Sequence, residues 1–210
     1  MIHPELYAWN VDWEGWCEKF IYPATKDKMF RLVVRDMGDE IYQWQVFTEE
    51  FCSMMIEEVE HQNLWTVDRH DNYPTTDVLL TTLGLDDMYN KVLEEFCHPF
   101  ARKLWGLEGK GWKSVISENF MARYTEDSQT YLAVHHDSSD YTFTLGLNTN
   151  FEGGGTWFPN QKKLANPKGG TVSLFPNITH PHGGMPTTKG KRYIIVSFVE
   201  RKTDDWGKPK

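Results

Sequence analysis

The sequence contains little cysteine, and none of it is arranged in a recognisable motif. Cysteine occurs 3 times in 210 residues, at Cys17, Cys52 and Cys97, and never as a C-x-x-C pair. This spacing gives no sign of a cysteine-based zinc site or a dithiol redox motif, and it allows at most one intrachain disulfide. Cys52 and Cys97 fall on the apolar faces of expected helices, which favours a packing role for both.

Positive charge and long hydrophobic runs are also scarce. Lys and Arg number 22 against 30 Asp and Glu, which gives a formal net charge of -8 and a pI near 5.5. This balance argues against a nucleic-acid partner, because such binding depends on neutralising phosphates, and it favours a basic substrate. No segment approaches the ~20 apolar residues of a membrane span, and residues 1–10 contain no apolar run of signal-peptide length.

Several well-known catalytic motifs are missing. The chain has no H-E-x-x-H, no Walker loop, no G-x-G-x-x-G and no G-x-S-x-G. The run Gly153-Gly154-Gly155 is not followed by Lys and Ser or Thr, and no helix is expected there. A tight turn or a bulge is therefore the better interpretation of this run.

The hydrophobic pattern predicts one globular domain in which helices precede strands. Hydrophobic residues at 40% and aromatic residues at 14% suffice for a core rich in aromatic rings. We expect an N-terminal extension packed on the domain at residues 1–40, the domain itself at 41–203 and a C-terminal tail at 204–210. The strand-rich core is expected at about 113–200.

Two helices are expected before the strands. Thr48 followed by two glutamates predicts a helix that begins at this cap and runs to about Glu60. A second helix is expected from a cap at Asp86 to Phe100, and Pro99 should kink or break it. Between them, the weak periodicity from Asn63 to Pro74 predicts a loop.

Short segments rich in β-branched and aromatic residues follow, separated by Gly, Pro, Asn and Asp. This order of helices and strands predicts an α+β domain with a β-sandwich or barrel core. The expected strands are Val115–Tyr124, Thr130–Val134, Tyr141–Asn148, Gly155–Phe158, Thr171–Pro176 and Arg192–Glu200.

The run His135-His136-Asp137 is the strongest candidate for a metal site. Residues two apart in an extended chain project to the same face, so His135 and Asp137 can reach one ion while His136 points away. A third ligand must come from a distant strand. His180 and His182 are also two apart, so the same alternation leaves both of them open.

Arg192 completes the constellation on the last expected strand. Two imidazoles, one carboxylate and an arginine are typical of a non-haem Fe(II) oxygenase that uses a 2-oxo acid, with the guanidinium binding the far carboxylate of that acid. On this strand Arg192, Ile194 and Val196 alternate with Tyr193, Ile195 and Ser197, so Ser197 is expected to face away from the arginine.

Several blocks of this sequence resemble the C-terminal catalytic domain of the procollagen-lysine 2-oxoglutarate 5-dioxygenases, the lysyl hydroxylases. The block HGGMPTTKGKRYIIVSFV is the most specific, and its position before PTT-x-G-x-RYI selects His182 as the distal histidine. The resembling stretches are Phe47–Trp65, Arg69–His70 with Thr75–Leu85, Asn119–Tyr124, His135–Ser139, Phe151–Phe158 and His182–Val199, with weaker similarity at Trp13–Pro23.

The resemblance implies a double-stranded β-helix (jelly-roll) barrel flanked by N-terminal helices, and it implies residue roles. Its iron ligands fall on His135, Asp137 and His182, and its binder of the distal 2-oxoglutarate carboxylate falls on Arg192. It also assigns cosubstrate contacts to Tyr124 and Arg69. At Thr144 the family usually has an asparagine that contacts the cosubstrate, and the threonine hydroxyl offers an altered contact.

The implied reaction is hydroxylation of peptidyl lysine in collagen-like sequences to 5-hydroxylysine, with release of succinate and CO2. It uses Fe(II), 2-oxoglutarate, O2 and L-ascorbate (vitamin C). The resemblance also implies a homodimer and the endoplasmic reticulum lumen. Two alternatives are a related peptidyl hydroxylase acting on proline or another side chain, and a catalytically silent barrel that serves as an interaction module.

Asp140 and the run Asn177-Ile178-Thr179 each allow a functional and a non-functional interpretation. Asp140 is a candidate for an acidic lip that receives a lysine ammonium, although a solvated turn aspartate is the favoured interpretation. Asn177-Ile178-Thr179 matches a glycosylation sequon, but a glycan there would crowd the pocket, so a chance match is favoured.

Overall fold

The computed structural model describes residues 1–67, 69, 73–107 and 112–203. All helices of the described residues precede residue 105, but short strands at residues 35–36, 42–45 and 77–79 lie among them, so the predicted order of helices before strands is only partly right. The helical segments are the 3-10 helix η1 (Pro4–Asn10), α1 (Trp13–Phe20), α2 (Pro23–Lys26), α3 (Phe30–Val33), α4 (Glu49–Gln62), α5 (Leu80–Leu83), α6 (Asp86–Val92), the π-helix η2 (Leu93–Cys97) and α7 (His98–Leu104).

The strands of the described residues form two antiparallel sheets. The larger sheet has the order β1-β2-β10-β6-β12-β4-β3, with β7 paired to β12, and the smaller sheet has the order β5-β11-β8-β9. The strands are β1 (Arg35–Asp36), β2 (Tyr42–Gln45), β3 (Asp77–Leu79), β4 (Trp112–Thr125), β5 (Leu132–His135), β6 (Tyr141–Gly146), β7 (Phe151–Gly153), β8 (Thr156–Phe158), β9 (Lys163–Ala165), β10 (Thr171–Pro176), β11 (His182–Gly184) and β12 (Thr187–Thr203).

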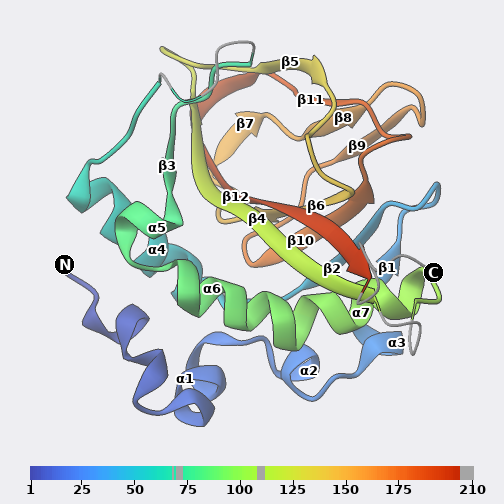
Figure 1. Cartoon of the computed structure of the whole chain (residues 1–210). Coiled ribbons are helices and arrows are strands. Elements are labelled where there is room, and N and C mark those ends of the chain that lie inside the picture. The colour runs from blue at the N-terminus through green and yellow to red at the C-terminus, as the bar shows by residue number, and fades with distance from the viewer. Residues whose placement is uncertain (68, 70–72, 108–111, 204–210) are drawn as a thin grey trace.

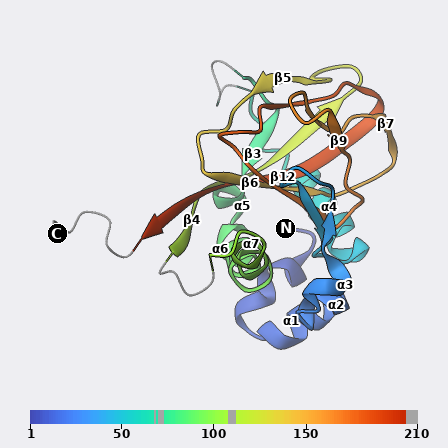
Figure 2. The same ribbon diagram turned by 90° about the vertical axis from the view of Figure 1, so that its right-hand side faces the viewer.

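The two sheets form the upper part of the molecule in Figure 1, and the helices cover the larger sheet from below. The main core lies between them, because side chains of α4 and α6 such as Met55 and Met88 belong to one buried cluster with Phe143 and Ile195 of the sheet. Figure 2 shows the same layers from the side. The opposite face of the larger sheet is left to line a cavity.

The long strand β12 serves both layers because its side chains alternate. Tyr193 and Ile195 belong to the main core, whereas Arg192, Ile194 and Val196 line the cavity on the other face. The predicted alternation on this strand is therefore confirmed. β12 also pairs with both β4 and β6, which ties the cavity wall to the centre of the larger sheet.

The N-terminal segment packs on the helices and contributes to the sheet. Trp16 and Phe20 lie against Phe51 of α4, and the Trp13 indole nitrogen donates a hydrogen bond to Glu95 at 2.9 Å. β1 pairs with β2 at the edge of the larger sheet. Several side chains of residues 1–40, such as Trp16 and Phe20, thus belong to the main core, while the boundary at residue 40 stays a prediction.

The helix predicted from Thr48 is confirmed, since the Thr48 hydroxyl accepts a hydrogen bond from the Phe51 amide and the helix runs from Glu49 to Gln62. The cap predicted at Asp86 is wrong. Leu85 is the N-cap residue, and the Asp86 carboxylate instead accepts hydrogen bonds from the side chains of Asn90 and Asn119.

Pro99 neither breaks the helix nor bends it sharply. The helix continues from α6 into α7 through the π-helical turn at Leu93–Cys97 (Figure 1). Because this wider turn ends just before Pro99, the proline falls in the first turn of α7, where a backbone N–H is not needed. The predicted kink is therefore replaced by a local π turn.

Most predicted strands are confirmed with shifted ends, and Thr171–Pro176 has the predicted bounds. The short strands β1, β2, β3, β7, β9 and β11 were not predicted. Gly153, Gly154 and Gly155 form a turn with φ angles of 78°, 68° and 99°, as expected for that run. The expected tail at residues 204–210 and part of the expected loop from Asn63 to Pro74 lie outside the described residues.

All three cysteines are free and buried, in agreement with the packing role predicted for Cys52 and Cys97. Within the described residues, no helix has both the length and the apolar character needed to cross a membrane.

His98 of α7 is a buried titratable group at the boundary of helix and sheet. Its Nδ1 lies 3.1 Å from the Tyr141 hydroxyl, which donates to Ser114 Oγ at 2.8 Å, and its Nε2 has no partner among the described residues. Burial lowers the pKa of His98 to about 3, and the charge of Arg102 contributes in the same direction.

This burial predicts a pH-dependent stability. Below the unfolded-state pKa of about 6.5 the unfolded chain binds a proton at His98 that the folded chain excludes, so stability falls as the pH falls. Relative to His98→Leu, the wild type should lose about 2 kcal/mol of unfolding free energy between pH 7 and pH 5. Urea unfolding at both pH values measures this, and an unchanged difference between the two proteins would contradict the assignment.

Candidate active site

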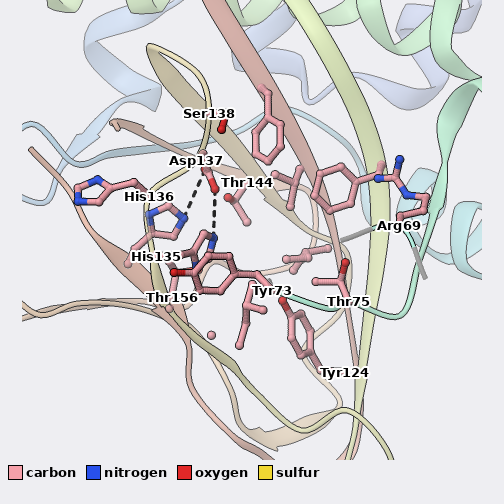
Figure 3. A pocket seen from close by; sticks show the side chains of 18 of the residues that line it. Arg69, Tyr73, Thr75, Tyr124, His135, His136, Asp137, Ser138, Thr144 and Thr156 are labelled. Carbon is pink, nitrogen blue, oxygen red and sulfur yellow. Dashed lines mark hydrogen bonds and ion pairs between the residues drawn. The ribbon is translucent and has the colours of Figure 1, made fainter. Parts of the chain in front are cut away.

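The two sheets bring His135, Asp137 and His182 together. His135 ends β5, Asp137 follows it by two residues, and His182 begins β11 directly opposite His135 in the strand register. The Nε2 atoms of His135 and His182 lie 3.1 Å and 3.4 Å from the two carboxylate oxygens of Asp137. Figure 3 shows the ring of His135 beside Asp137. The three ligand atoms all lie within 4.8 Å of one another, a spacing that suits one metal ion.

Backbone carbonyls orient both imidazoles. His135 Nδ1 donates to the Ala133 carbonyl at 2.8 Å, and His182 Nδ1 donates to the His180 carbonyl at 3.0 Å. Since a carbonyl oxygen only accepts, each Nδ1 carries a hydrogen, and Nε2 is the ring nitrogen that faces Asp137 and that a metal ion would bind after losing its own hydrogen. The donor set therefore fits a divalent cation that prefers nitrogen and carboxylate ligands.

The electrostatics of the triad favour a cation as well. Burial acts to raise the pKa of Asp137, but hydrogen bonds from His135, His182 and Thr142 together hold this pKa well below its usual range. Burial lowers the pKa of His135, yet the hydrogen bond and charge of Asp137 reverse this and raise it. A bound metal ion would replace the His135 proton, so its affinity should fall in acid.

His136 and His180 are turned away from this centre. His136 Nδ1 donates to the Asn177 carbonyl at 2.8 Å, and Figure 3 shows its ring pointing away from Asp137. His180 Nε2 donates to the Asp39 carbonyl at 2.6 Å, and its Nδ1 lies 2.8 Å from the Thr179 hydroxyl. Both ring nitrogens of His180 are thus occupied, which leaves His182 as the third candidate ligand.

The triad lies in a cavity of about 420 Å³ between the sheets. Strands β4, β5, β11 and β12 contribute most of the residues that line it. The lining residues are Arg69, Tyr73, Thr75, Phe120, Tyr124, Leu132, His135, His136, Asp137, Ser138, Thr144, Thr156, His182, Gly183, Gly184, Arg192, Ile194, Val196 and Phe198.

Arg192 is a buried cation that lacks a counterion in the described structure. Its side chain is 2% exposed, its Nη2 atom has no hydrogen-bond partner among the described residues, and its guanidinium lies 5.3 Å from the centre of the Tyr124 ring. Burial lowers the pKa of Arg192, but a guanidinium stays protonated in proteins. An unpaired buried charge is costly, so this end of the cavity fits a carboxylate ligand.

The other predicted cosubstrate residues differ in their surroundings. Tyr124 and Thr144 line the cavity and are buried. Arg69 lines it too, but its guanidinium pairs with Asp77 and with both Glu118 oxygens at 3.1 Å and 3.2 Å, and it lies over the Phe120 ring. A cosubstrate contact for Arg69 therefore stays a prediction.

Asp140 does not line the cavity of the triad. Its carboxylate accepts a hydrogen bond from the Arg201 amide at 2.6 Å and lies 3.5 Å from the Arg201 guanidinium. These contacts give it a structural role at the end of β12.

Three neighbours of the triad were not assigned a role from the sequence. The Thr142 hydroxyl donates to Asp137 Oδ2 at 2.6 Å, Asn177 Nδ2 donates to Thr142 Oγ1 at 2.9 Å, and the Tyr73 ring lies over His135 with centroids 4.9 Å apart. The polar face of Tyr141–Asn148 was a signal for Thr142, because it contains both Thr142 and Thr144. Nothing in the local pattern of Asn177 or Tyr73 indicates the triad.

Comparison with known families decides the classification. A model described as the OGFOD2-like domain matches residues 1–109, which is slightly more than half of the chain. The chain belongs to the OGFOD2-like domain family. The model of the 2OG-Fe(II) oxygenase superfamily matches residues 120–200, so the sheet region of this OGFOD2-like protein is a 2OG-Fe(II) oxygenase domain. This superfamily implies Fe(II) and 2-oxoglutarate as its ligands, in agreement with the triad and Arg192.

The resemblance to lysyl hydroxylases is confirmed. The chain is 32% identical over 214 residues to the multifunctional procollagen lysine hydroxylase and glycosyltransferase LH3 of Rattus norvegicus, which covers 95% of this chain and 29% of that protein. It is 31% identical over 213 residues to procollagen-lysine,2-oxoglutarate 5-dioxygenase 1 of Homo sapiens, with the same two coverages. The chain thus spans 29% of the length of these relatives.

Solved structures confirm the jelly-roll fold. A viral collagen prolyl hydroxylase from Paramecium Bursaria Chlorella virus-1 has a TM-score of 0.56 at 20% identity, covering 79% of this chain and 98% of that one. A prolyl-4-hydroxylase from Pseudomonas putida has a TM-score of 0.60 at 13% identity, covering 83% and 100%.

A metal titration distinguishes His182 of β11 from His180, which precedes that strand. His182→Ala should raise the dissociation constant for Mn(II) on the order of 100-fold or more, because it removes one of three ligands. His180→Ala should leave this constant near the wild-type value, since both nitrogens of His180 serve other contacts. Isothermal titration calorimetry measures both, and the reverse order of effects would contradict the ligand assignment.

The unpaired guanidinium predicts opposite effects on stability and ligand binding. Arg192→Met should raise the melting temperature of the ligand-free protein, because it removes an uncompensated buried charge, yet weaken 2-oxoglutarate binding on the order of 100-fold. Thermal unfolding with and without 2-oxoglutarate checks both effects. As a matched control, Arg69→Met should lower the melting temperature, since it leaves Asp77 and Glu118 without this partner. Unchanged 2-oxoglutarate affinity in Arg192→Met would refute the assigned role.

Proposed function

We propose that this OGFOD2-like protein is an Fe(II)- and 2-oxoglutarate-dependent dioxygenase that hydroxylates peptidyl lysine in collagen-like sequences to 5-hydroxylysine, releasing succinate and CO2. The observation that carries the reaction class is the buried Arg192 guanidinium in the same cavity as the His135, Asp137 and His182 triad. A cation site and an anion site within one cavity match a metal ion and a 2-oxo diacid.

Each group in the cavity has a role in this proposal. His135, Asp137 and His182 would hold Fe(II), which leaves three positions of an octahedral ion to 2-oxoglutarate and O2. Arg192 would bind the distal carboxylate of 2-oxoglutarate, with Tyr124 beside it and Thr144 offering a hydroxyl. When bound, Fe(II) supplies O2 activation coupled to oxidative decarboxylation of the 2-oxo acid. Ile194, Val196 and Phe198 line the same cavity and exclude water from it.

The lysine and collagen parts of the proposal are supported by the relatives. Two of the similar proteins are named procollagen lysine hydroxylases, and the net charge of -8 favours a basic substrate. L-Ascorbate as the reductant that keeps iron ferrous, and a homodimer, belong to the same proposal.

A second candidate is hydroxylation of a neutral side chain such as proline. Among the described residues that line the cavity, Asp137 is the only carboxylate, and it belongs to the triad. Glu118, nearby on β4, is already paired with Arg69. A lysine ammonium would therefore need a carboxylate from elsewhere, and the similar folds include prolyl hydroxylases.

Turnover with a peptide panel tests both candidates. The purified chain with Fe(II), ascorbate, 2-oxoglutarate and O2 should form succinate with a collagen-like peptide that contains lysine, and mass spectrometry should find one added oxygen on the lysine. Peptides with the lysine replaced by norleucine or arginine, and peptides whose proline is the target, serve as comparisons. Oxygen found on proline instead would favour the second candidate.

Asp137→Ala separates an enzyme from a silent interaction module. This change should abolish succinate formation, because it removes the single carboxylate ligand of the triad. If the wild type made no succinate with any peptide of the panel, the silent-module interpretation would replace the proposed function.

A further inference from the structure

We propose that Thr142 and Asn177 are positioning residues for Asp137: the Thr142 hydroxyl, oriented by the Asn177 amide, fixes the carboxylate plane that receives the metal ion. The identity of this ion as Fe(II) rests on the proposed function, whereas the hydrogen-bond chain does not. Neither residue was singled out by its resemblance to the lysyl hydroxylases.

Asp137 needs such a contact because it lies beyond the end of β5. His135 is the last residue of that strand, so no strand pairing holds Asp137 in place. The Thr142 hydroxyl donates to Asp137 Oδ2 at 2.6 Å, and Thr142 belongs to β6 in the middle of the larger sheet. This hydrogen bond therefore connects the Asp137 carboxylate, which lies outside any strand, to strand β6.

The direction of each hydrogen bond follows from chemistry. An ionised carboxylate only accepts, so the single Thr142 hydroxyl hydrogen must point to Asp137. The Thr142 oxygen must then accept, and Asn177 Nδ2 supplies the donor at 2.9 Å. The same amide nitrogen lies 2.6 Å from Ser139 Oγ. The Asn177 amide thus orients the Thr142 hydroxyl so that its hydrogen points to Asp137.

Asn177 is itself held from two sides. It is 1% exposed, its backbone carbonyl accepts the His136 Nδ1 hydrogen at 2.8 Å, and its backbone amide donates to the Asp140 carbonyl at 3.0 Å. His136, which faces away from the metal site, therefore serves the same chain of contacts. The buried and bonded Asn177 side chain also makes the sequon at this position a chance match.

Asp137 differs from the two histidines in what orients it. His135 and His182 donate to backbone carbonyls, which no side-chain substitution removes. The Asp137 contact outside the triad comes from the side chain of Thr142. Replacing that one hydroxyl isolates its effect on the site.

Cobalt titration of the full chain tests the inference without turnover. Co(II) binding is followed by its visible absorption, and Thr142→Val, which keeps the shape and removes the hydroxyl, should raise the Co(II) dissociation constant about 10- to 100-fold. Thr142→Ser restores the hydroxyl and should stay within about threefold of the wild type.

Thr25→Val is the matched control. Thr25 is also fully buried, and its hydroxyl donates to the Gln45 carbonyl at 2.5 Å, far from the triad in sequence and outside the cavity lining. The same chemical change there should lower the melting temperature and leave Co(II) affinity unchanged.

Asn177→Leu, alone and combined with Thr142→Val, completes a double-mutant cycle. Asn177→Leu should raise the Co(II) dissociation constant by less than Thr142→Val, and adding it to Thr142→Val should cause no further rise, because Asn177 acts through Thr142. If Thr142→Val does not fold, Asn177→Leu against Thr142→Ser still decides the matter.

Three results would overturn the inference: wild-type Co(II) affinity in Thr142→Val and Asn177→Leu, equal losses in Thr142→Ser and Thr142→Val, or an equal loss in Thr25→Val. Additive losses in the double variant would overturn the part assigned to Asn177. Failure of the proposed function is distinguishable, because it would appear as normal Co(II) binding with no turnover by the wild type.

Discussion

The pairing of β11 with β5 is the contact on which the candidate metal site depends. The register places His182 directly opposite His135, and a shift of one residue would turn one imidazole to the outer face of the smaller sheet. Gly183 protects this register, since a Cβ there would lie 2.8 Å from the Leu132 carbonyl oxygen. The glycines after His182 thus allow the two strands to approach, and Asp137, the third residue of the triad, follows the end of β5.

The cavity contains two charged side chains, Asp137 and Arg192, which differ in how far their charge is compensated by hydrogen bonds. Asp137 receives hydrogen bonds from two histidines and one threonine, so its charge is compensated before any ligand binds. Arg192 has an aromatic ring beside it, and its Nη2 is without a hydrogen-bond partner in the described part of the chain. A buried cation of this kind lowers stability, and the large core between the helices and the other face of β12 offsets that loss. The same strand therefore supplies both the stabilising side chains and the destabilising one.

The sequence predicted features that depend on alternation and missed those that depend on contacts across the fold. Two-residue spacing selected His135 with Asp137 and placed Arg192 opposite the core face of its strand, because side-chain direction in a strand is local. The same rule could not separate His180 from His182, since what distinguishes them is the Asp39 carbonyl, 141 residues away from His180. Asp86 failed as a cap for a similar reason: Asn119, on a later strand, binds its carboxylate. The unpredicted strands have two to four residues, too few for a period to show.

Gly154 constrains the surroundings of Arg192 in the cavity. A Cβ at this position would lie 2.9 Å from Cδ of Arg192 and equally close to the Phe151 ring, and its φ of 68° already disfavours other residues. The arginine stem occupies the space that any side chain here would need. Alanine at this position would have to displace the Arg192 stem or the Phe151 ring, so the place of the guanidinium in the cavity depends on a missing side chain in a neighbouring turn.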